Sequence, residues 1–405
     1  MNILFLSELF YPHGSGGELA TYLYAKLLSE AGINVIVITN RFAGESDVSK
    51  EGKLTVYRLP LLKRGGSIKY SILQRFDVLS SSFMRKLIKW ADLVYIPKFW
   101  YSAIPFAKAY GKPVVTHLHG YFPICPLSNC YDLTTSRICN RSLSCSPKCI
   151  YTYEKNQEKG LTETLTSVVL NSTLRPYFSR FMKLVDAVIC VSKAQQEILI
   201  RHARSLSPKI HVIYNPLPDV SYLDIEGDDF GYFSGPSPLK GFHVLSYALT
   251  YAQACASVKT LKVHVTNLNI RANNAKWLNQ RGIIAYKRLD ETCYEKLYRR
   301  IRSVVVPSIW PETYGYVACE ALLRGRIVIA SAIGGIPEVV EGCPGAFLFR
   351  AGDYIQLADK MTAVKNLSRE TVADLGARNR ETIQKKFSDD KILRMFVDVL
   401  TKIAD

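Results

Sequence analysis

The chain has 405 residues, of which 48% are hydrophobic and 21% are charged. This length exceeds that of one ordinary core and this composition excludes a disordered chain, so two globular domains are expected. The net charge is +17, and residues 1–215 hold 27 Lys and Arg against 14 Asp and Glu, a net of +13. A basic first half suits nucleic acid, an anionic membrane face or a phosphorylated acceptor, with a solvated basic surface as the alternative.

The N-terminal stretch MNILFLSELFYP lacks a basic segment and a small-residue cleavage site. We therefore interpret it as a first buried strand and not as a signal peptide. No apolar run reaches about 18 residues, which argues against a spanning helix. These features predict a cytoplasmic protein, or one bound peripherally at the cytoplasmic face of a membrane.

Residues 1–40 contain a strand (NILFLS), a Gly-rich loop (YPHGSGG), a helix (ELATYLYAKLLSEAG) and a second strand (NVIVITN). Apolar residues recur at helical spacing in the third segment, and Gly32 is placed to end that helix. A strand, a helix and a further apolar strand in this order make a parallel βαβ unit.

Two series of apolar segments follow, most of them separated by helical stretches. The first lies at 93–97, 113–120 and 187–192, and the second at 230–235, 261–266, 282–286, 303–308 and 327–332. Two doubly wound α/β units fit this pattern better than one sheet. The two prolines of VIYNPLPD (212–219) mark the joint, which predicts domains at 1–215 and 216–387. The tail at 388–405 has a strong amphipathic helix pattern and is expected to pack back on the first domain.

The stretch WPETYGYVACEAL, residues 310–322, holds two carboxylates, Glu312 and Glu320, beside a predicted strand end and helix start. Ligands of open α/β sheets bind at this end of the strands. The first amides of the helix, those of Gly315, Tyr316 and Val317, would attract a diphosphate, and the two acids would accept hydrogen bonds from neighbouring hydroxyls. The alternative is a pair of solvated acids on a helix surface.

These residues also carry a family resemblance. PSIWPETYGYVACEALLRGRIVIASAIGGIPEVVEG resembles the donor-binding segment of the retaining family 4 glycosyltransferases, with their E-x7-E pair. YPHGSGGELATYLYAKLLSEAGINVIVITN resembles the Gly-rich loop and first helix of that family, and DAVICVSKAQQEIL and VIYNPLPD resemble the end of its N-domain. The resemblance implies the α/β GT-B architecture, two Rossmann-like domains facing across a cleft. It also implies hexosyl transfer with retained configuration from a nucleotide sugar, a UDP- or GDP-sugar.

The resemblance assigns roles to individual residues. It makes Glu312 a contact of the sugar hydroxyls, Glu320 the ribose ligand and Lys240 the phosphate-binding cation, and it places His119 near the sugar's C6 hydroxyl. The implied catalytic residues are His119, Glu312 and Lys240, and the implied donor-binding residues are Gly16, Gly17, Lys240, Gly315, Tyr316, Val317 and Glu320. The alternative interpretations are that Lys240 is a surface lysine, that His117 and His119 are core histidines, and that the glycines serve only their turn.

The segment SGPSPLK departs from the family, because Pro236 stands where an Arg is usual. A second phosphate-binding cation must then come from elsewhere, with Arg271, Lys287 and Arg288 as candidates. No D-x-D motif occurs, which suits stabilisation of the leaving group by Lys240 and the helix dipole without a metal or other cofactor.

Five of the ten cysteines fall within residues 125–149, namely Cys125, Cys130, Cys139, Cys145 and Cys149. Cys125, Cys139, Cys145 and Cys149 are a candidate structural zinc site, although no C-x2-C pair is present. A disulfide and reduced thiols are the other two interpretations.

The basic first half favours a lipid-linked or phosphorylated saccharide acceptor at an anionic membrane surface, with MRKLIKW (84–90) as an amphipathic contact. The alternative is the same chemistry on a soluble acceptor. A non-enzymatic nucleic-acid-binding protein ranks below both, because no RNA or DNA motif is present and the acid pair would stay unexplained. We therefore expect no nucleic-acid partner.

Overall fold

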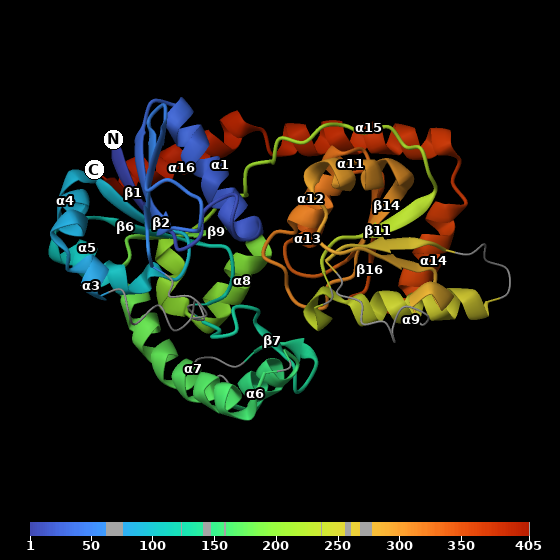
Figure 1. Cartoon of the computed structure of the whole chain (residues 1–405), viewed down its shortest axis with the longest axis horizontal. Coiled ribbons are helices and arrows are strands. Elements are labelled where there is room, and N and C mark those ends of the chain that lie inside the picture. The colour runs from blue at the N-terminus through green and yellow to red at the C-terminus, as the bar shows by residue number, and fades with distance from the viewer. Residues whose placement is uncertain are drawn as a thin grey trace. The chain divides into compact units, whose positions relative to one another are not determined.

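The computed structural model describes residues 1–61, 76–122, 124–140, 147–157, 159–235, 237–255, 261–267 and 278–404. The chain forms two compact units (Figure 1). One comprises Met1–Pro216 with Ser388–Asp405, and the other comprises Leu217–Phe387. Both are α/β units built on a sheet of mainly parallel strands, as the alternation of apolar strands and helices predicts.

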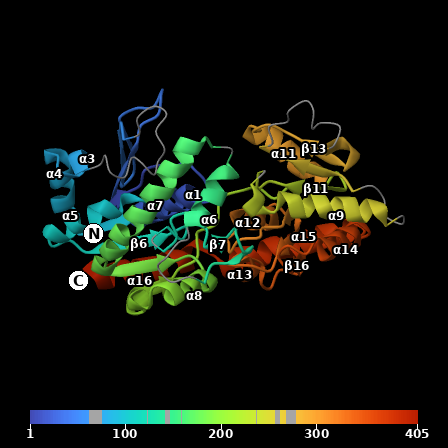
Figure 2. The same cartoon turned by 90° about the horizontal axis from the view of Figure 1, so that it is seen from below.

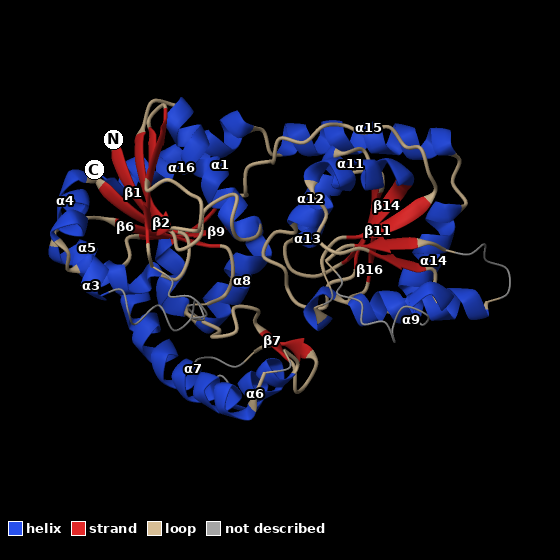
Figure 3. Ribbon diagram, viewed as in Figure 1, coloured by secondary structure: helices blue, strands red, loops and turns tan. Residues whose placement is uncertain are grey.

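The first unit has an eight-stranded sheet in the order β10-β9-β6-β5-β1-β2-β4-β3. All neighbours run parallel except β3, which pairs antiparallel with β4 at the edge. The strands are β1 (Asn2–Leu6), β2 (Asn34–Asn40), β3 (Val48–Glu51), β4 (Leu54–Leu59), β5 (Leu93–Ile96), β6 (Val114–Leu118), β9 (Ala187–Cys190) and β10 (Ile210–Val212). The central strands read as continuous apolar runs because helices cover both faces (Figure 3).

The helices of the first unit connect these strands. They are α1 (Gly16–Glu30), α3 (Phe76–Leu79), α4 (Ser82–Trp90), α5 (Ala103–Ala109), α6 (Pro147–Lys155), α7 (Leu161–Phe181), α8 (Lys193–His202) and α16 (Asp389–Ala404). A small hairpin, β7 (Tyr131–Asp132) with β8 (Arg137–Ile138), follows β6. Among the described residues, no helix combines the length and apolar character needed to cross a membrane.

The second unit has a six-stranded, all-parallel sheet in the order β13-β12-β11-β14-β15-β16. Its strands are β11 (Asp229–Tyr232), β12 (Val263–Val265), β13 (Ile283–Ala285), β14 (Ile301–Val306), β15 (Ile327–Ser331) and β16 (Ala346–Phe349). Its helices are α9 (Phe242–Ala254), α11 (Glu291–Arg300), α12 (Tyr316–Leu323), α13 (Ile336–Val340), α14 (Tyr354–Lys365) and α15 (Arg369–Lys386). The core lies between the sheet and these helices.

Every strand expected from an apolar run is present, with ends shifted by at most two or three residues. β3, β4, β10, β16 and the β7–β8 hairpin are not among the predicted strands. β4 alternates apolar and polar residues and lies near a sheet edge, while β16 has only four residues. Short strands carry weak periodicity, and the alternation of β4 is not the continuous apolar run by which the other strands were predicted.

Helix α16 closes the fold of the first unit. Its buried residues, Ile392, Phe396 and Leu400, recur every four positions and form one stripe. The Phe396 ring lies 4.4 Å from the ring of Tyr24 and 5.6 Å from that of Tyr95, measured between centroids. The last helix of the chain thus completes a core that begins with its first strands.

We predict that Phe396→Ala lowers the free energy of unfolding by about 3–5 kcal/mol, because it leaves a cavity among fully buried rings. Urea denaturation of the full chain measures this loss. Asp398→Ala, an exposed change on the same helix, is the control. Equal losses for the two variants would contradict the packing described here.

Candidate active site

The loop after β11 carries Lys240 and is held rigidly. Tyr232, at the end of β11, donates its hydroxyl to the carbonyl oxygens of Gly235 (2.6 Å) and Lys240 (3.2 Å). Gly241 follows with φ +77°, and a Cβ there would lie 1.8 Å from the Pro307 carbonyl oxygen. Only glycine permits this approach, so the Lys240 loop is fixed against the end of β14.

The structure pairs two residues to which the sequence analysis gave separate roles. Lys240 Nζ lies 2.8 Å from Glu312 Oε1, and the Ser308 hydroxyl donates to the same oxygen. Glu312 is 8% exposed, whereas the Lys240 side chain is 28% exposed. A buried carboxylate is costly unless it is paired and hydrogen-bonded, and both conditions are met here.

Trp310 flanks this ion pair. Lys240 Nζ lies 5.2 Å from the centroid of its ring, within range of a cation–π contact. The buried indole N–H of Trp310 has no hydrogen-bond partner in the described part of the chain. A buried donor of this kind next to a charged pair is a natural contact for a ligand.

A second loop supports the backbone of Glu312. The Gly335 N–H donates to the Glu312 carbonyl oxygen at 2.7 Å. Gly334 has φ +58°, and a Cβ there would lie 2.3 Å from that same oxygen. The loops after β14 and β15 are therefore packed tightly together, and the direction of the Glu312 side chain is set by both.

Helix α12 begins directly after this loop. Gly315 is its N-cap with φ +108°, and Tyr316 and Val317 form its first turn. The first N–H groups of any helix have no intrahelical acceptor and carry the positive end of the helix dipole. All three predicted phosphate ligands thus lie at a helix N-terminus, at the carboxyl end of β14.

Glu320 lies further along α12, beside Tyr294 and Tyr298 of α11. Burial raises the pKa of its carboxyl group, and the nearby Arg324 guanidinium opposes that rise. The Arg324 contact is long, 4.0 Å, and a quarter of the Glu320 side chain is exposed. Its carboxylate retains the capacity to accept hydrogen bonds from a ligand.

In the first unit, the Gly-rich loop is organised around Glu18, which the sequence analysis overlooked. This carboxylate is 4% exposed and accepts hydrogen bonds from the Ser15 N–H (2.8 Å), the Ser15 hydroxyl (3.0 Å) and Lys98 Nζ (2.8 Å). Burial acts to raise its pKa, but Lys98 and Ser15 more than offset this effect and hold the pKa below its ordinary value. Glu18 is therefore ionised.

His119 lies against the start of α1. A Cβ on Gly17 would lie 2.9 Å from the His119 Cβ, so glycine allows the helix to touch the histidine, whereas Gly16 is the first residue of the helix. The rings of His117 and His119 stack at 4.5 Å. Burial lowers the pKa of His119 to about 4, partly opposed by Glu18 and reinforced by Lys98. The imidazole is neutral at neutral pH.

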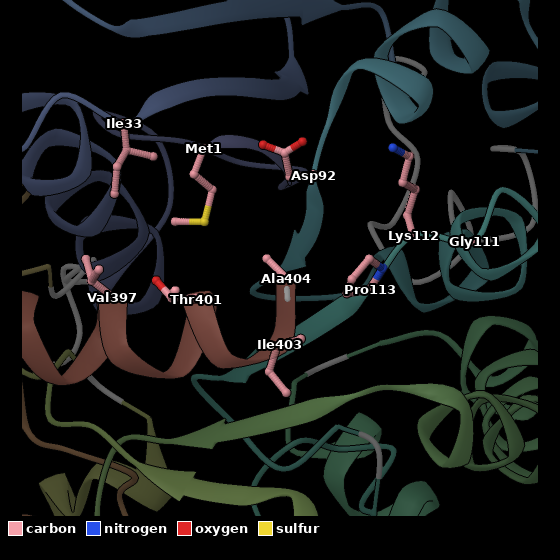
Figure 4. Close-up of a pocket in the computed structure, with 10 residues that line it drawn as sticks. All are labelled: Met1, Ile33, Asp92, Gly111, Lys112, Pro113, Val397, Thr401, Ile403 and Ala404. Carbon is pink, nitrogen blue, oxygen red and sulfur yellow. The ribbon is translucent and has the colours of Figure 1, made fainter.

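A hollow of about 740 Å³ lies at the opposite end of the first sheet (Figure 4). It is lined by residues that precede β1, β2, β5 and β6, together with residues of α16: Met1, Ile33, Asp92, Gly111, Lys112, Pro113, Val397, Thr401, Ile403 and Ala404. Because ligands of such sheets bind at the carboxyl ends of the strands, we do not assign the active site to this hollow.

The cysteine cluster gives no support for zinc. The described residues contain no group of three or more His, Cys, Asp or Glu side chains placed to hold a metal, and Cys145 lies outside them. Instead, the Cys130 thiol donates a hydrogen bond to Cys125. That bond and nearby backbone N–H groups oppose the effect of burial and lower the pKa of Cys125 to about 6. Cys149 is buried, and its thiol contacts the Tyr131 carbonyl oxygen at 3.8 Å.

Two of the three candidates for a second phosphate-binding cation lie among the described residues. Lys287 and Arg288 are exposed in the loop after β13, while Arg271 and Pro236 lie outside the described residues. The residues that sequence reasoning missed are Ser15, Glu18, Lys98, Tyr232, Ser308 and Trp310. Ser15 and Glu18 form an S-x-x-E helix start, which is a readable signal. Lys98 meets Glu18 in the first unit, and Tyr232 meets the Lys240 loop in the second, only through the folding of each unit.

Comparisons with known proteins identify the family of the chain. A profile described as "Glycosyltransferase Family 4" matches residues 14–219, half of the chain, and one described as "Glycosyl transferases group 1" matches residues 232–366. The chain is 28% identical over 244 residues to a glycosyltransferase of Methanocaldococcus jannaschii, covering 59% of this chain and 66% of that protein, just under two thirds of its length. It is 21% identical over 371 residues to a protein of the Klebsiella pneumoniae cps region, covering 86% and 89%.

Solved structures are similar over the full length. Sucrose-phosphate synthase from Thermosynechococcus elongatus has a TM-score of 0.69 and 16% identity, covering 99% of this chain and 98% of that one. Anabaena HepE, solved with UDP and glucose, has a TM-score of 0.62 and 20% identity, covering 99% of both. These identities show the GT-B fold, as predicted. The family profile over residues 14–219 shows that the chain belongs to glycosyltransferase family 4.

Proposed function

We propose that this protein transfers a hexosyl group from a UDP- or GDP-sugar, with retention, to a lipid-linked or phosphorylated saccharide at an anionic membrane surface. In this proposal the second unit binds the donor and the first binds the acceptor. The observation that carries it is the Lys240–Glu312 pair beside the N-terminus of α12, all at the carboxyl ends of the second sheet. Anabaena HepE was solved with UDP-glucose, which favours a UDP-sugar.

The donor diphosphate binds where positive charge is concentrated. The N–H groups of Gly315, Tyr316 and Val317 and the Lys240 ammonium face it, and each strengthens its contact as negative charge grows on the leaving phosphate. Because these groups supply the stabilising charge, the proposed reaction uses no divalent metal. The leaving phosphate itself takes the acceptor proton on the same face of the sugar, which accounts for retention.

The two acids and the histidine hold hydroxyl groups. Glu312 accepts hydrogen bonds from the sugar and stabilises its oxocarbenium-like charge, while Glu320 accepts from the ribose. Neutral His119 has one ring nitrogen that donates and one that accepts, which suits the sugar's C6 hydroxyl. Gly16 and Gly17 leave room for the N-terminal loop to approach the ligands without a side-chain clash.

Helix α4, residues 82–90, has a different role from the one expected of an amphipathic membrane contact. Three of its apolar residues, Met84, Leu87 and Ile88, are buried within the first unit. Its outward face carries Arg85, Lys86 and Lys89. The helix therefore offers electrostatic attraction to anionic lipid but only one exposed large apolar side chain, that of Phe83.

We predict that Lys240→Ala and Glu320→Ala each lower kcat/KM on the order of 100-fold or more, because each removes a contact to the donor phosphates or ribose. Turnover is measured with a panel of UDP- and GDP-sugars. Lys385→Ala and Glu381→Ala, exposed on α15, are the matched controls. Near wild-type turnover in both site variants, with the fold intact, would refute the assignment.

The pKa of His119 leads to a pH prediction. This histidine has a pKa of about 4 in the folded state and 6.5 in the unfolded state. Between these pH values it is neutral in the folded protein and protonated in the unfolded chain, so a falling pH favours unfolding. Its contribution is therefore complete above pH 6.5 and is lost as the pH falls toward 4, by about 3 kcal/mol in total.

We expect His119→Gln to flatten this fall in urea titrations between pH 6.5 and 4. His117, whose pKa burial also lowers, remains in the variant, so part of the pH dependence persists. Parallel pH profiles for wild type and His119→Gln would contradict the prediction.

Membrane association is tested by flotation. We expect the wild-type protein to rise with phosphatidylcholine vesicles containing phosphatidylglycerol, to rise less with pure phosphatidylcholine, and to be released by added salt, because the basic charge supplies the attraction. Protein that stays at the bottom of the gradient with anionic vesicles would favour a soluble acceptor.

A further inference from the structure

Helix α7 buries polar side chains. Thr164, Ser167 and Asn171 are 0%, 5% and 8% exposed. The Ser167 hydroxyl donates to the buried carboxylate of Glu154 on α6 at 2.6 Å, and the Asn171 side-chain amide donates to the Ser167 carbonyl oxygen at 2.8 Å. α7 thus turns polar side chains inward, and one of them, Ser167, bonds α6, which is the reverse of an ordinary amphipathic helix.

The outward face of α7 is apolar. Leu161, Leu165 and Val169 are 59%, 51% and 62% exposed, and their spacing of four residues places them in one stripe along the helix. The sequence has no charged residue from Thr164 to Leu174. An isolated exposed leucine needs no explanation, but an uncharged stripe on a helix whose polar side is buried indicates that something covers it.

The neighbouring helix indicates what the stripe contacts. On α6, Lys148, Tyr151 and Lys155 are exposed at spacings of three and four residues, so they share one face. Lysines that attract anionic headgroups, with a tyrosine between them, are typical of a helix at a membrane interface. Figures 1 and 2 show α6 and α7 side by side in the first unit. A net charge of +17 opposes contact with a second copy and favours an anionic surface.

We propose that the α6–α7 pair docks on an anionic lipid bilayer, with Leu161, Leu165 and Val169 entering the boundary between headgroups and acyl chains and with Lys148 and Lys155 contacting lipid phosphates. The choice of a membrane as the partner rests on the proposed function, because that function places the acceptor at a membrane surface. It goes further by assigning the apolar contact to α7 and not to α4.

The test is flotation of full-length Leu165→Ser/Val169→Ser with phosphatidylcholine vesicles containing phosphatidylglycerol. We expect the vesicle-bound fraction to fall about 10-fold or more relative to wild type, because two apolar side chains no longer leave water. Tyr247→Ser, an equally exposed apolar residue at 59% on α9, is the control and should float like wild type. Leu165→Trp should show a blue-shifted emission on adding the same vesicles, which supports the proposal independently of any loss of stability.

Two other outcomes would each overturn the docking proposal. If the double variant floats like wild type, another surface makes the apolar contact and the docking proposal is wrong, while the proposed function stands. If instead the wild type is a dimer in light scattering and the double variant is a monomer, a second copy covers α7, which also overturns the proposal. Turnover with a nucleotide sugar and a water-soluble acceptor reports on the transferase separately, and we expect all these variants to retain it.

Discussion

The ion pair between Lys240 and Glu312 is the interaction on which the proposed donor site depends. Glu312 is buried at the end of a parallel strand, where an unpaired carboxylate would be strongly unfavourable. Lys240 and Ser308 together satisfy it, and three glycines, Gly241, Gly334 and Gly315, allow the surrounding loops to pack closely enough to hold that geometry. An ammonium group that is held in place and still partly exposed is prepared for a phosphate without further ordering.

The first unit contains a similar buried ion pair, formed by different residues. Glu18 is as buried as Glu312 and is likewise satisfied by one lysine, Lys98, and one serine, Ser15. In each unit the carboxylate lies where a loop meets the start of a helix or the end of a strand. Such pairs add little net stability because desolvation offsets attraction, so their value lies in fixing charged groups at defined positions.

The first unit also distributes polarity unevenly among its helices. α4 and α16 bury apolar stripes in the usual way, whereas α7 buries Ser167 and Asn171, and Ser167 bonds Glu154 of α6. Hydrogen bonds between buried polar groups specify one arrangement of two helices, since a shifted register would leave donors and acceptors unsatisfied. Because the polar side of α7 faces inward, its apolar residues face outward. The packing of the helix pair is thereby linked to the proposed contact with lipid.

The sequence by itself determined the architecture, because apolar strands alternating with amphipathic helices have few other ways to bury their surfaces. It also predicted the helix start at Gly315 between the acids at 312 and 320, since these lie within one continuous motif. Only the tertiary structure decided which groups meet. Lys240 pairs with Glu312, Lys98 with Glu18, and Ser167 with Glu154, and these partners lie 13 to 80 positions apart in the sequence. Contacts of that kind follow from the packing of whole elements, and no local pattern records them.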